Sequence, residues 1–298
     1  MKQMRLYLYI TLGAFLALFI VGTFVDFQLS SAIYSSRNTF GLVVSVLEGV
    51  FGYGIIALMG GGLLSLFFKK EAFPKWGRIL FLIGSIFCLG ITTYFSGNEY
   101  FGLNGFYWTA KTFYGYFISF PIMALLTYLG YLFFKKVDNP NLWIILVTFL
   151  ICYAVAIVAG SLVIKIIFHR PRFRAVMAYD EIRYLPWYTR CTNYKGLMKT
   201  YGLASEEFKS FPSGHATRII SLPVVMVLLP LVDKKYTKYR LPLFICGLAI
   251  ALLVMFSRIL VGAHYLSDVS MGALITIILF IAGLETIRAS KKNKYLIF

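Results

Sequence analysis

Long runs of apolar residues alternate with short polar segments along the whole chain. A helix of about 20 apolar residues crosses the roughly 30 Å hydrocarbon core of a bilayer. The runs predict membrane-spanning helices at 6–25, 43–68, 79–97, 115–134, 143–167, 214–232, 241–261 and 266–287. No small-residue cleavage site precedes Asp26, so the first run is expected to remain as a helix. We therefore expect an all-α fold, a polytopic transmembrane bundle of about eight helices.

Composition supports a membrane protein and excludes an ordinary soluble domain. Hydrophobic residues make up 59% of the 298 residues and charged residues only 14%. A typical soluble domain carries roughly 25% charged residues. The formal net charge of +17 is of the size that can indicate a nucleic-acid partner. Most of this charge lies in short clusters between apolar runs, so membrane topology explains it and no nucleic-acid partner is expected.

Basic clusters in the short loops predict the orientation of the helices. With eight helices, the clusters before helix one and after helices two, four, six and eight fall on one side. They contain Lys2, Arg5, Lys69, Lys70, Lys75, Arg78, Lys135, Lys136, Lys234, Lys235, Lys238, Arg240, Arg288, Lys291, Lys292 and Lys294, against Arg37 and Lys111 in the first two loops of the other side. The positive-inside rule makes the cluster side cytoplasmic. Both termini are then cytoplasmic, and the long basic loop 169–211 is outside.

The segment Lys165-Ile-Ile-Phe-His-Arg-Pro-Arg172 ends the fifth predicted helix. Pro171 disfavours helix at Arg170, so the helix is expected to end near His169 with Arg172 just beyond. Arginine offers a fork of donors that matches two phosphate oxygens, and lysine offers a point charge. The segment therefore indicates a phosphate site, with snorkelling of basic side chains to the interface as the alternative.

The string Pro212-Ser213-Gly214-His215 precedes the sixth predicted helix. The free N–H groups of a helix start attract anions, and glycine allows another group to approach the backbone closely. The Ser213 hydroxyl and the Gly214 amide are therefore candidate phosphate donors, and His215 beside them is a candidate for proton transfer. The alternative is a histidine with a purely structural role at a helix start.

The third motif is Ser257-Arg258, followed by His264 and Asp268. The last two are four residues apart and share a helix face. A carboxylate bonded to one imidazole nitrogen fixes the tautomer and leaves the other nitrogen as a nucleophile. Charged groups at membrane depth are costly, which favours a functional interpretation with a partner. The alternative is an Arg258–Asp268 ion pair that closes the hairpin.

Together, the three motifs resemble the type 2 phosphatidic acid phosphatase superfamily. Its signature is K-x6-R-P, then P-S-G-H, then S-R-x5-H-x3-D, and the resemblance covers residues 144–285 with Phe173 in place of one proline. The resemblance implies that His264 attacks phosphorus to form a phosphohistidine, with Asp268 orienting it. His215 would protonate the leaving oxygen and then activate water. The implied phosphate-binding residues are Lys165, Arg172, Ser213, Gly214 and Arg258.

The resemblance also implies a catalytic core of six helices, so one amino-terminal hairpin is extra. We expect amino-terminal transmembrane helices in 1–142 and a core carrying the three motifs in 143–298. No metal or cofactor is expected, because no metal-ligand spacing is present and fixed cations replace the metal. Membrane lipids and a lipid phosphate are the expected partners. The oligomeric state and the roles of His169, Arg218 and Glu48 stay open.

The expected activity is that of a membrane lipid phosphatase at the outer face of the cell membrane. Its substrate would be a lipid phosphate or diphosphate of the undecaprenyl diphosphate, phosphatidylglycerol phosphate or phosphatidate type. Three alternatives remain open: a phosphotransferase with the same site, a phosphatase of soluble phosphate esters, and a non-enzymatic lipid-binding protein with a relic site.

Overall fold

The structure, a computed structural model, describes residues 2–36, 38–99 and 114–289, and these residues form helices and no strands. Eight helical spans in this part of the chain are long and apolar enough to cross a membrane. They are α1 (Lys2–Ile33), α2 (Thr39–Phe67), α3 (Lys75–Glu99), α4 (Tyr114–Phe134), α5 (Leu142–Ile157) with η2 (Val158–Val163) and α6 (Ile164–Phe168), α9 (Gly214–Ile219) with α10 (Ser221–Val232), α11 (Arg240–Leu260) and α12 (Leu266–Ala289). The predicted fold class is confirmed.

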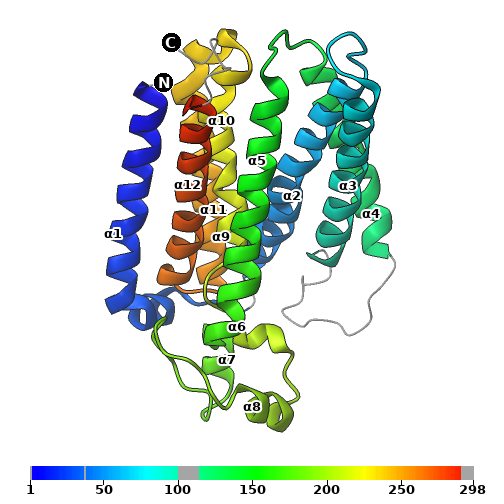
Figure 1. Ribbon diagram of the computed structural model, residues 1–298. Helices are drawn as coiled ribbons and strands as arrows, with labels where there is room; N and C mark the ends of the chain where they lie inside the picture. Colours follow the sequence, from blue (N-terminus) through cyan, green and yellow to red (C-terminus); the bar gives the residue numbers. More distant parts are fainter. Residues whose placement is uncertain (1, 37, 100–113, 290–298) are drawn as a thin grey trace.

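The spans form one elongated bundle (Figure 1). Helices α2, α3 and α4 pack against one another on one side, and α1 packs along α12 on the other. Helices α5, α9, α10 and α11 lie between these groups, and α2 also packs against α5, α9 and α11. The amino-terminal helices are therefore in direct contact with the elements that carry the three motifs.

Loops that were predicted to share one side do share one end of the bundle. Arg5 Nη2 lies 2.6 Å from Glu285 Oε2, which joins the start of α1 to the end of α12. Lys69 Nζ donates to the Val137 carbonyl at 2.9 Å, which joins the α2–α3 loop to the α4–α5 loop. The start of α1 and the end of α12 both lie at this end (Figure 1). The predicted loop cations Arg37, Lys111, Lys291, Lys292 and Lys294 lie outside the described residues.

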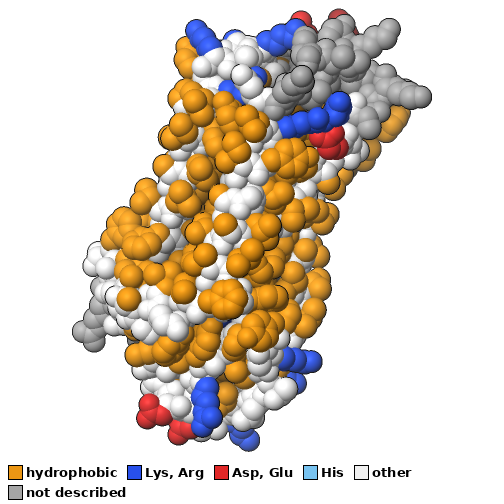
Figure 2. All heavy atoms as spheres, turned by 90° about the vertical axis from the view of Figure 1, so that its left-hand side faces the viewer, with side chains coloured by type: hydrophobic (Ala, Val, Ile, Leu, Met, Phe, Trp, Pro, Cys, Tyr) orange, Lys and Arg blue, Asp and Glu red, His pale blue; other side chains and the backbone are white. Residues whose placement is uncertain are grey.

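The side wall of the bundle is apolar. On the face that carries α1, hydrophobic side chains cover the middle, and charged side chains gather toward the two ends (Figure 2). Ile10, Ile20 and Phe24 of α1 are 59%, 52% and 75% exposed. Soluble proteins rarely expose a continuous apolar surface of this extent. Such a wall is compatible with an integral membrane protein.

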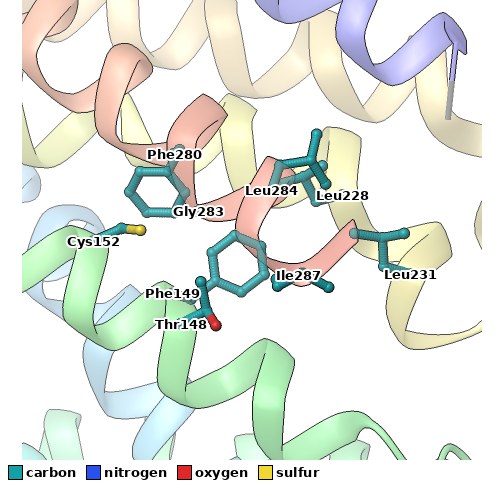
Figure 3. A pocket seen from close by; sticks show the side chains of 9 residues that line it. All are labelled: Thr148, Phe149, Cys152, Leu228, Leu231, Phe280, Gly283, Leu284 and Ile287. Carbon is teal, nitrogen blue, oxygen red and sulfur yellow. The ribbon is translucent and has the colours of Figure 1, made fainter. Parts of the chain in front are cut away.

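Between α5, α10 and α12 lies a small apolar pocket (Figure 3). Phe149 and Cys152 of α5 face Phe280 of α12, with Leu228 and Leu231 of α10 closing one side. All of these residues belong to the main hydrophobic core. The core thus continues along the bundle axis, away from the motif residues.

Helix α1 is longer than the apolar run that predicted it. The expected end was residue 25, but the helix continues to Ile33. Asp26 lies inside it, with a fully buried side chain 2.9 Å from Arg170 Nη2. Because the Arg170 guanidinium pairs with the Asp26 carboxylate, α1 can continue past this charged residue.

At the end of the bundle opposite the start of α1, the loop 169–211 folds into a small cap (Figure 1). It contains α7 (Phe173–Ala178), α8 (Tyr194–Tyr201) and the 3₁₀ turn η3 (Ser205–Phe208). Its own hydrophobic cluster is centred on Ala175, Ile182, Cys191 and Phe208. The cap therefore presents ordered side chains above the ends of the spanning helices.

Candidate active site

The first motif lies where α6 meets the cap. Helix α6 ends at Phe168, and His169 takes a left-handed conformation with φ 47°. This agrees with the predicted helix end near His169. Lys165 in the last turn and Arg172 beyond it are both buried. The Arg172 amide donates to the Glu207 carbonyl at 2.8 Å, which holds the segment against the cap.

The second motif begins the sixth span. Ser213 caps α9, and its side-chain oxygen accepts from the Ala216 amide at 3.3 Å. The Ser213 amide donates to the Asp268 carbonyl at 2.9 Å. Gly214 and His215 form the first turn and are buried. The backbone thus joins the second motif directly to the third.

A tight turn from α11 to α12 carries the third motif. Gly262 has φ +65°, and a Cβ there would lie 2.7 Å from the Tyr34 ring, so glycine is required at this position. The amides of Ala263 and His264 both donate to the Arg258 carbonyl, at 3.0 and 3.2 Å. This turn folds His264 back over the end of α11 and beside Arg258.

The rings of His215 and His264 lie near each other, with centroids 5.8 Å apart and planes inclined by 58°. Nδ1 of His264 lies 2.7 Å from the Ser210 carbonyl oxygen, whereas Asp268 Oδ2 is 3.8 Å away. A carbonyl oxygen only accepts, so Nδ1 carries the proton and Nε2 keeps its lone pair. Nε2 has no hydrogen-bond partner among the described residues. The Ser210 carbonyl, rather than Asp268 directly, sets the tautomer that the sequence predicted for His264.

Electrostatics keep His264 neutral. Burial lowers the pKa of His264 to about 3, and the positive charges of Arg172 and Lys165 act in the same direction. An imidazole with this pKa is unprotonated at neutral pH. His264 therefore presents an uncharged ring nitrogen in a site that carries cations.

Asp268 lies in a dense polar cluster. Arg170 Nη1 contacts its Oδ1 at 2.5 Å, and both side chains are fully buried. Its Oδ2 accepts hydrogen bonds from the Ser210 hydroxyl and from the Tyr265 amide, the latter at 2.8 Å. The carboxylate thus holds Ser210, whose carbonyl contacts His264. Arg170, and not the Arg258 considered from the sequence, is the arginine seen bound to Asp268.

Asp26 of α1 also belongs to this cluster, although no motif includes it. Its Oδ2 lies 2.9 Å from Arg170 Nη2, and its Oδ1 accepts from the Ser267 amide at 2.9 Å. The Arg170 guanidinium also lies 4.0 Å from the centre of the Tyr265 ring. The one available sequence signal was a carboxylate next to a long apolar run, because such a group needs a partner.

Glu48 of α2 is the second residue that the motifs missed. Arg218 donates to it from Nε at 2.9 Å and from Nη2 at 2.8 Å. His215 Nε2 lies 3.7 Å from Glu48 Oε2. The sequence marked Glu48 and Arg218 as ionisable groups in apolar spans but did not pair them.

A groove of about 290 Å³ opens beside Lys165, lined by Leu162, Val163, Lys165, Ile166, Glu206 and Lys209. Lys209 Nζ lies 2.6 Å from Glu206 Oε1 at its rim. Burial acts to raise the pKa of Glu206, but the Lys209 hydrogen bond and the Arg172 charge hold it below its ordinary value. Leu162 and Ile166 are 58% and 59% exposed. The groove therefore joins a charged rim to an apolar wall.

The structure places all eight predicted site residues, Lys165, Arg172, Ser213, Gly214, His215, Arg258, His264 and Asp268, at the cap end of the bundle. All eight are buried. Within the described ranges, no group of three or more His, Cys, Asp or Glu side chains is arranged to hold a metal ion.

A family model described as the PAP2 superfamily matches residues 141–292, about half of the chain. Searches of the curated proteins and of the solved structures found no match.

Proposed function

The chain belongs to the PAP2 superfamily, which makes it a phosphatase-type enzyme acting on phosphate esters, and we propose that its substrate is a lipid phosphate or diphosphate. The match confirms the resemblance first seen in the three motifs. The observation that carries the proposed mechanism is the state of His264, with Nδ1 bound to the Ser210 carbonyl at 2.7 Å and Nε2 without a partner among the described residues.

In the first proposed step, Nε2 of His264 attacks phosphorus. A nitrogen–phosphorus bond forms, the ester oxygen–phosphorus bond breaks, and His215 gives its proton to the leaving oxygen. Donors aimed at the phosphoryl oxygens stabilise the charge of the transition state. We assign this role to Lys165, Arg172, Ser213, Gly214 and Arg258.

In the second step, His215 takes a proton from water, and the oxygen of that water attacks phosphorus. The nitrogen–phosphorus bond breaks, inorganic phosphate leaves and His264 returns to its starting state. The two ring centroids lie 5.8 Å apart, so both imidazoles can act on the same bound phosphoryl group. Asp268 supports both steps through Ser210, because the acceptor of the Nδ1 proton cannot move away.

The groove beside Lys165 supports a lipid as substrate. Its rim carries Lys165, Glu206 and Lys209, and its wall is formed by Leu162, Val163 and Ile166. A lipid phosphate has a charged headgroup that would match the rim and a hydrocarbon tail that would match the wall. Each methylene of a lipid tail adds about 0.8 kcal/mol to membrane partitioning, so the membrane concentrates this substrate at the groove.

We propose further that the site faces the extracytoplasmic side of the cell membrane. The support is the positive-inside rule, applied to basic clusters that share the end opposite the site. Phosphatidate, phosphatidylglycerol phosphate and an undecaprenyl diphosphate-type carrier are the leading candidate substrates. Fixed cations around the phosphate supply the charge that a metal ion would otherwise provide, so metal-independent turnover is part of the proposal.

A substrate panel on the purified protein tests the lipid assignment. Released phosphate is measured for long-chain lipids, their short-chain forms and a water-soluble sugar phosphate in one detergent. We expect kcat/KM to fall in that order. A higher kcat/KM for the sugar phosphate than for every lipid would contradict the lipid assignment and leave the phosphatase intact.

Product analysis separates the remaining alternatives. Transfer of labelled phosphate to an added lipid alcohol, in place of its release, would identify a phosphotransferase. Any release of phosphate by purified protein, lost in His264→Asn, excludes a non-enzymatic relic.

A further inference from the structure

Helix α2 precedes the matched residues 141–292 and carries an ionisable residue that no motif includes. It packs against α9, which carries His215, and against α11, which ends near the third motif. Glu48 lies in the third turn of α2, and its side chain is fully buried. A carboxylate at this depth is costly unless it is paired and hydrogen-bonded.

Arg218 of α9 holds this carboxylate in one orientation. Its Nε and Nη2 donate to the two Glu48 oxygens at 2.9 and 2.8 Å, which is the forked geometry of a bidentate pair. The guanidinium also lies 4.6 Å from the centre of the Tyr53 ring. A Cβ on Gly52 would come within 2.5 Å of Glu48 Oε1, so the glycine leaves the space that the carboxylate occupies.

The same carboxylate faces the candidate general acid. Glu48 Oε2, which accepts from Arg218, lies 3.7 Å from His215 Nε2. This is too long for a hydrogen bond but close enough for strong charge interaction in a buried site. A negative charge at this distance favours the protonated imidazolium, which is the form that donates a proton.

The two histidines therefore have opposite surroundings, although their ring centroids are only 5.8 Å apart. His264 faces the cations Lys165 and Arg172 and is held neutral, as a nucleophile requires. His215 faces a carboxylate. Environments that separate the protonation states of two neighbouring groups are how enzymes assign a base and an acid at one pH.

We propose that Glu48 is a positioning residue whose charge keeps His215 protonated for its role as general acid. The inference rests on the proposed function, because that function makes His215 the proton donor. It adds a residue from the amino-terminal helices to the machinery of the site. A buried arginine–carboxylate pair is weak evidence for stability by itself, since burying both charges costs about as much as their attraction returns.

Besides Glu48 and His264, other charged and titratable groups of this site come from several elements. In the described part of the chain they are Arg218, Tyr53 and Tyr153 beside Glu48, and Lys165, Arg172 and Asp268 beside His264. The cations in this set disfavour protonation of His215. Glu48 is the carboxylate that lies 3.7 Å from His215 Nε2.

The test is a direct titration of the histidines by NMR. The chain has only three, His169, His215 and His264, so the imidazole signals are assigned by single substitutions. In Glu48→Gln, we expect the His215 midpoint to fall by about one pH unit or more, because an adjacent opposite charge is lost. The matched control is Glu285→Gln, which removes the carboxylate of another interhelical arginine pair at the far end of the bundle. It should leave the midpoint unchanged.

Glu48→Asp covers the case in which Glu48→Gln does not fold, because it keeps the buried charge balance. Its shorter side chain withdraws the carboxylate from His215, so a midpoint between those of the parent and Glu48→Gln is expected. A parental His215 midpoint in Glu48→Gln, or in Glu48→Asp where Glu48→Gln is not recovered, overturns the proposal.

Kinetics supply the functional part of the test. The basic limb of kcat/KM against pH should move to lower pH in Glu48→Gln by the same amount as the His215 midpoint, with Glu48→Asp partly restoring it. A purely structural role would lower the amount of folded enzyme without moving the limb. If the parent releases no phosphate from any substrate, the proposed function fails, while the NMR titration still decides whether Glu48 acts on His215.

Discussion

Arg170 and Asp268 form a fully buried ion pair, with Nη1 2.5 Å from Oδ1, that joins the first motif to the third. The second terminal nitrogen of the same guanidinium lies 2.9 Å from Asp26 Oδ2 on α1. One arginine thus pairs with two buried carboxylates that come from the first and last spanning helices. The orientation of the loop that presents His264 therefore depends on α1 as well as on the matched part of the chain.

Asp26→Asn should destabilise the protein and reduce turnover. Asparagine keeps the shape but removes the charge facing Arg170 and one acceptor of the Ser267 cluster. Loss of such a buried hydrogen-bonded group typically costs about 1–3 kcal/mol. The thermal unfolding midpoint in detergent and kcat measure the effect. Asp233→Asn, which alters a surface pair with Lys235, is the control and should stay close to the parent. Equal unfolding midpoints for the two variants would contradict the prediction.

His264→Asn should abolish the covalent intermediate. Loss of a positioned acid or base costs about 10²–10⁴-fold in rate, and loss of the nucleophile should cost at least as much. After acid-free quenching with labelled substrate, we expect an acid-labile phosphoenzyme in the parent and none in the variant. His169→Asn is the matched control, because asparagine tolerates the left-handed backbone at this position. The His169 ring stacks on Tyr194 in the cap. Near-parental turnover of His264→Asn would end the mechanism.

The stability of the folded protein should decrease as the pH is lowered, because of His264. Its pKa is about 3 in the folded protein, owing first to burial, and about 6.5 in the unfolded chain. Below about pH 6.5 the His264 imidazole is protonated in the unfolded state but stays neutral in the folded state. The folded state therefore loses stability as the pH falls toward 3. The loss amounts to at most about 1.4 kcal/mol per pH unit. Unfolding midpoints at pH 7, 6 and 5 should fall more steeply for the parent than for His264→Asn. Parallel curves would show that His264 is not buried and neutral.

Turnover should continue without divalent metal ions. Excess chelator should leave kcat unchanged, because Lys165, Arg172 and Arg258 supply the positive charge in the proposed site. Vanadate, which adopts the five-coordinate geometry of the transition state, should inhibit competitively. Loss of activity in chelator with recovery on adding Mg²⁺ or Zn²⁺ would show that a metal takes part.

The end of the bundle that carries the basic clusters should face the cytoplasm. Single cysteines at Lys69 and Lys234 should react with the same membrane-impermeant reagent only from the cytoplasmic side, and a cysteine at Lys199 in the cap only from outside. The four native cysteines must first be replaced. Labelling of Lys69→Cys and Lys234→Cys from opposite sides would overturn the proposed orientation.

Much of the fold was accessible from local patterns. Each apolar run is long enough to require a spanning helix, because backbone groups in hydrocarbon must be satisfied within the segment. The end of the fifth span at Phe168 followed from Pro171, which disfavours helix at the residue before it. The end of α1 was placed too early, because hydropathy counts Asp26 as a stop unless its partner is known.

The sequence by itself determined the helices, the clustering of basic loops and the three motifs. Within a motif, a spacing of three to seven residues places the side chains close together at one helix end. Only the tertiary structure decided which charges meet. Arg170 is 144 positions from Asp26, and Arg218 is 170 positions from Glu48. Such pairs have no signature in local spacing, because packing between helices brings them together. The Ser210 carbonyl that sets the His264 tautomer is likewise a backbone group, and its use depends on where the cap folds rather than on the identity of its side chain.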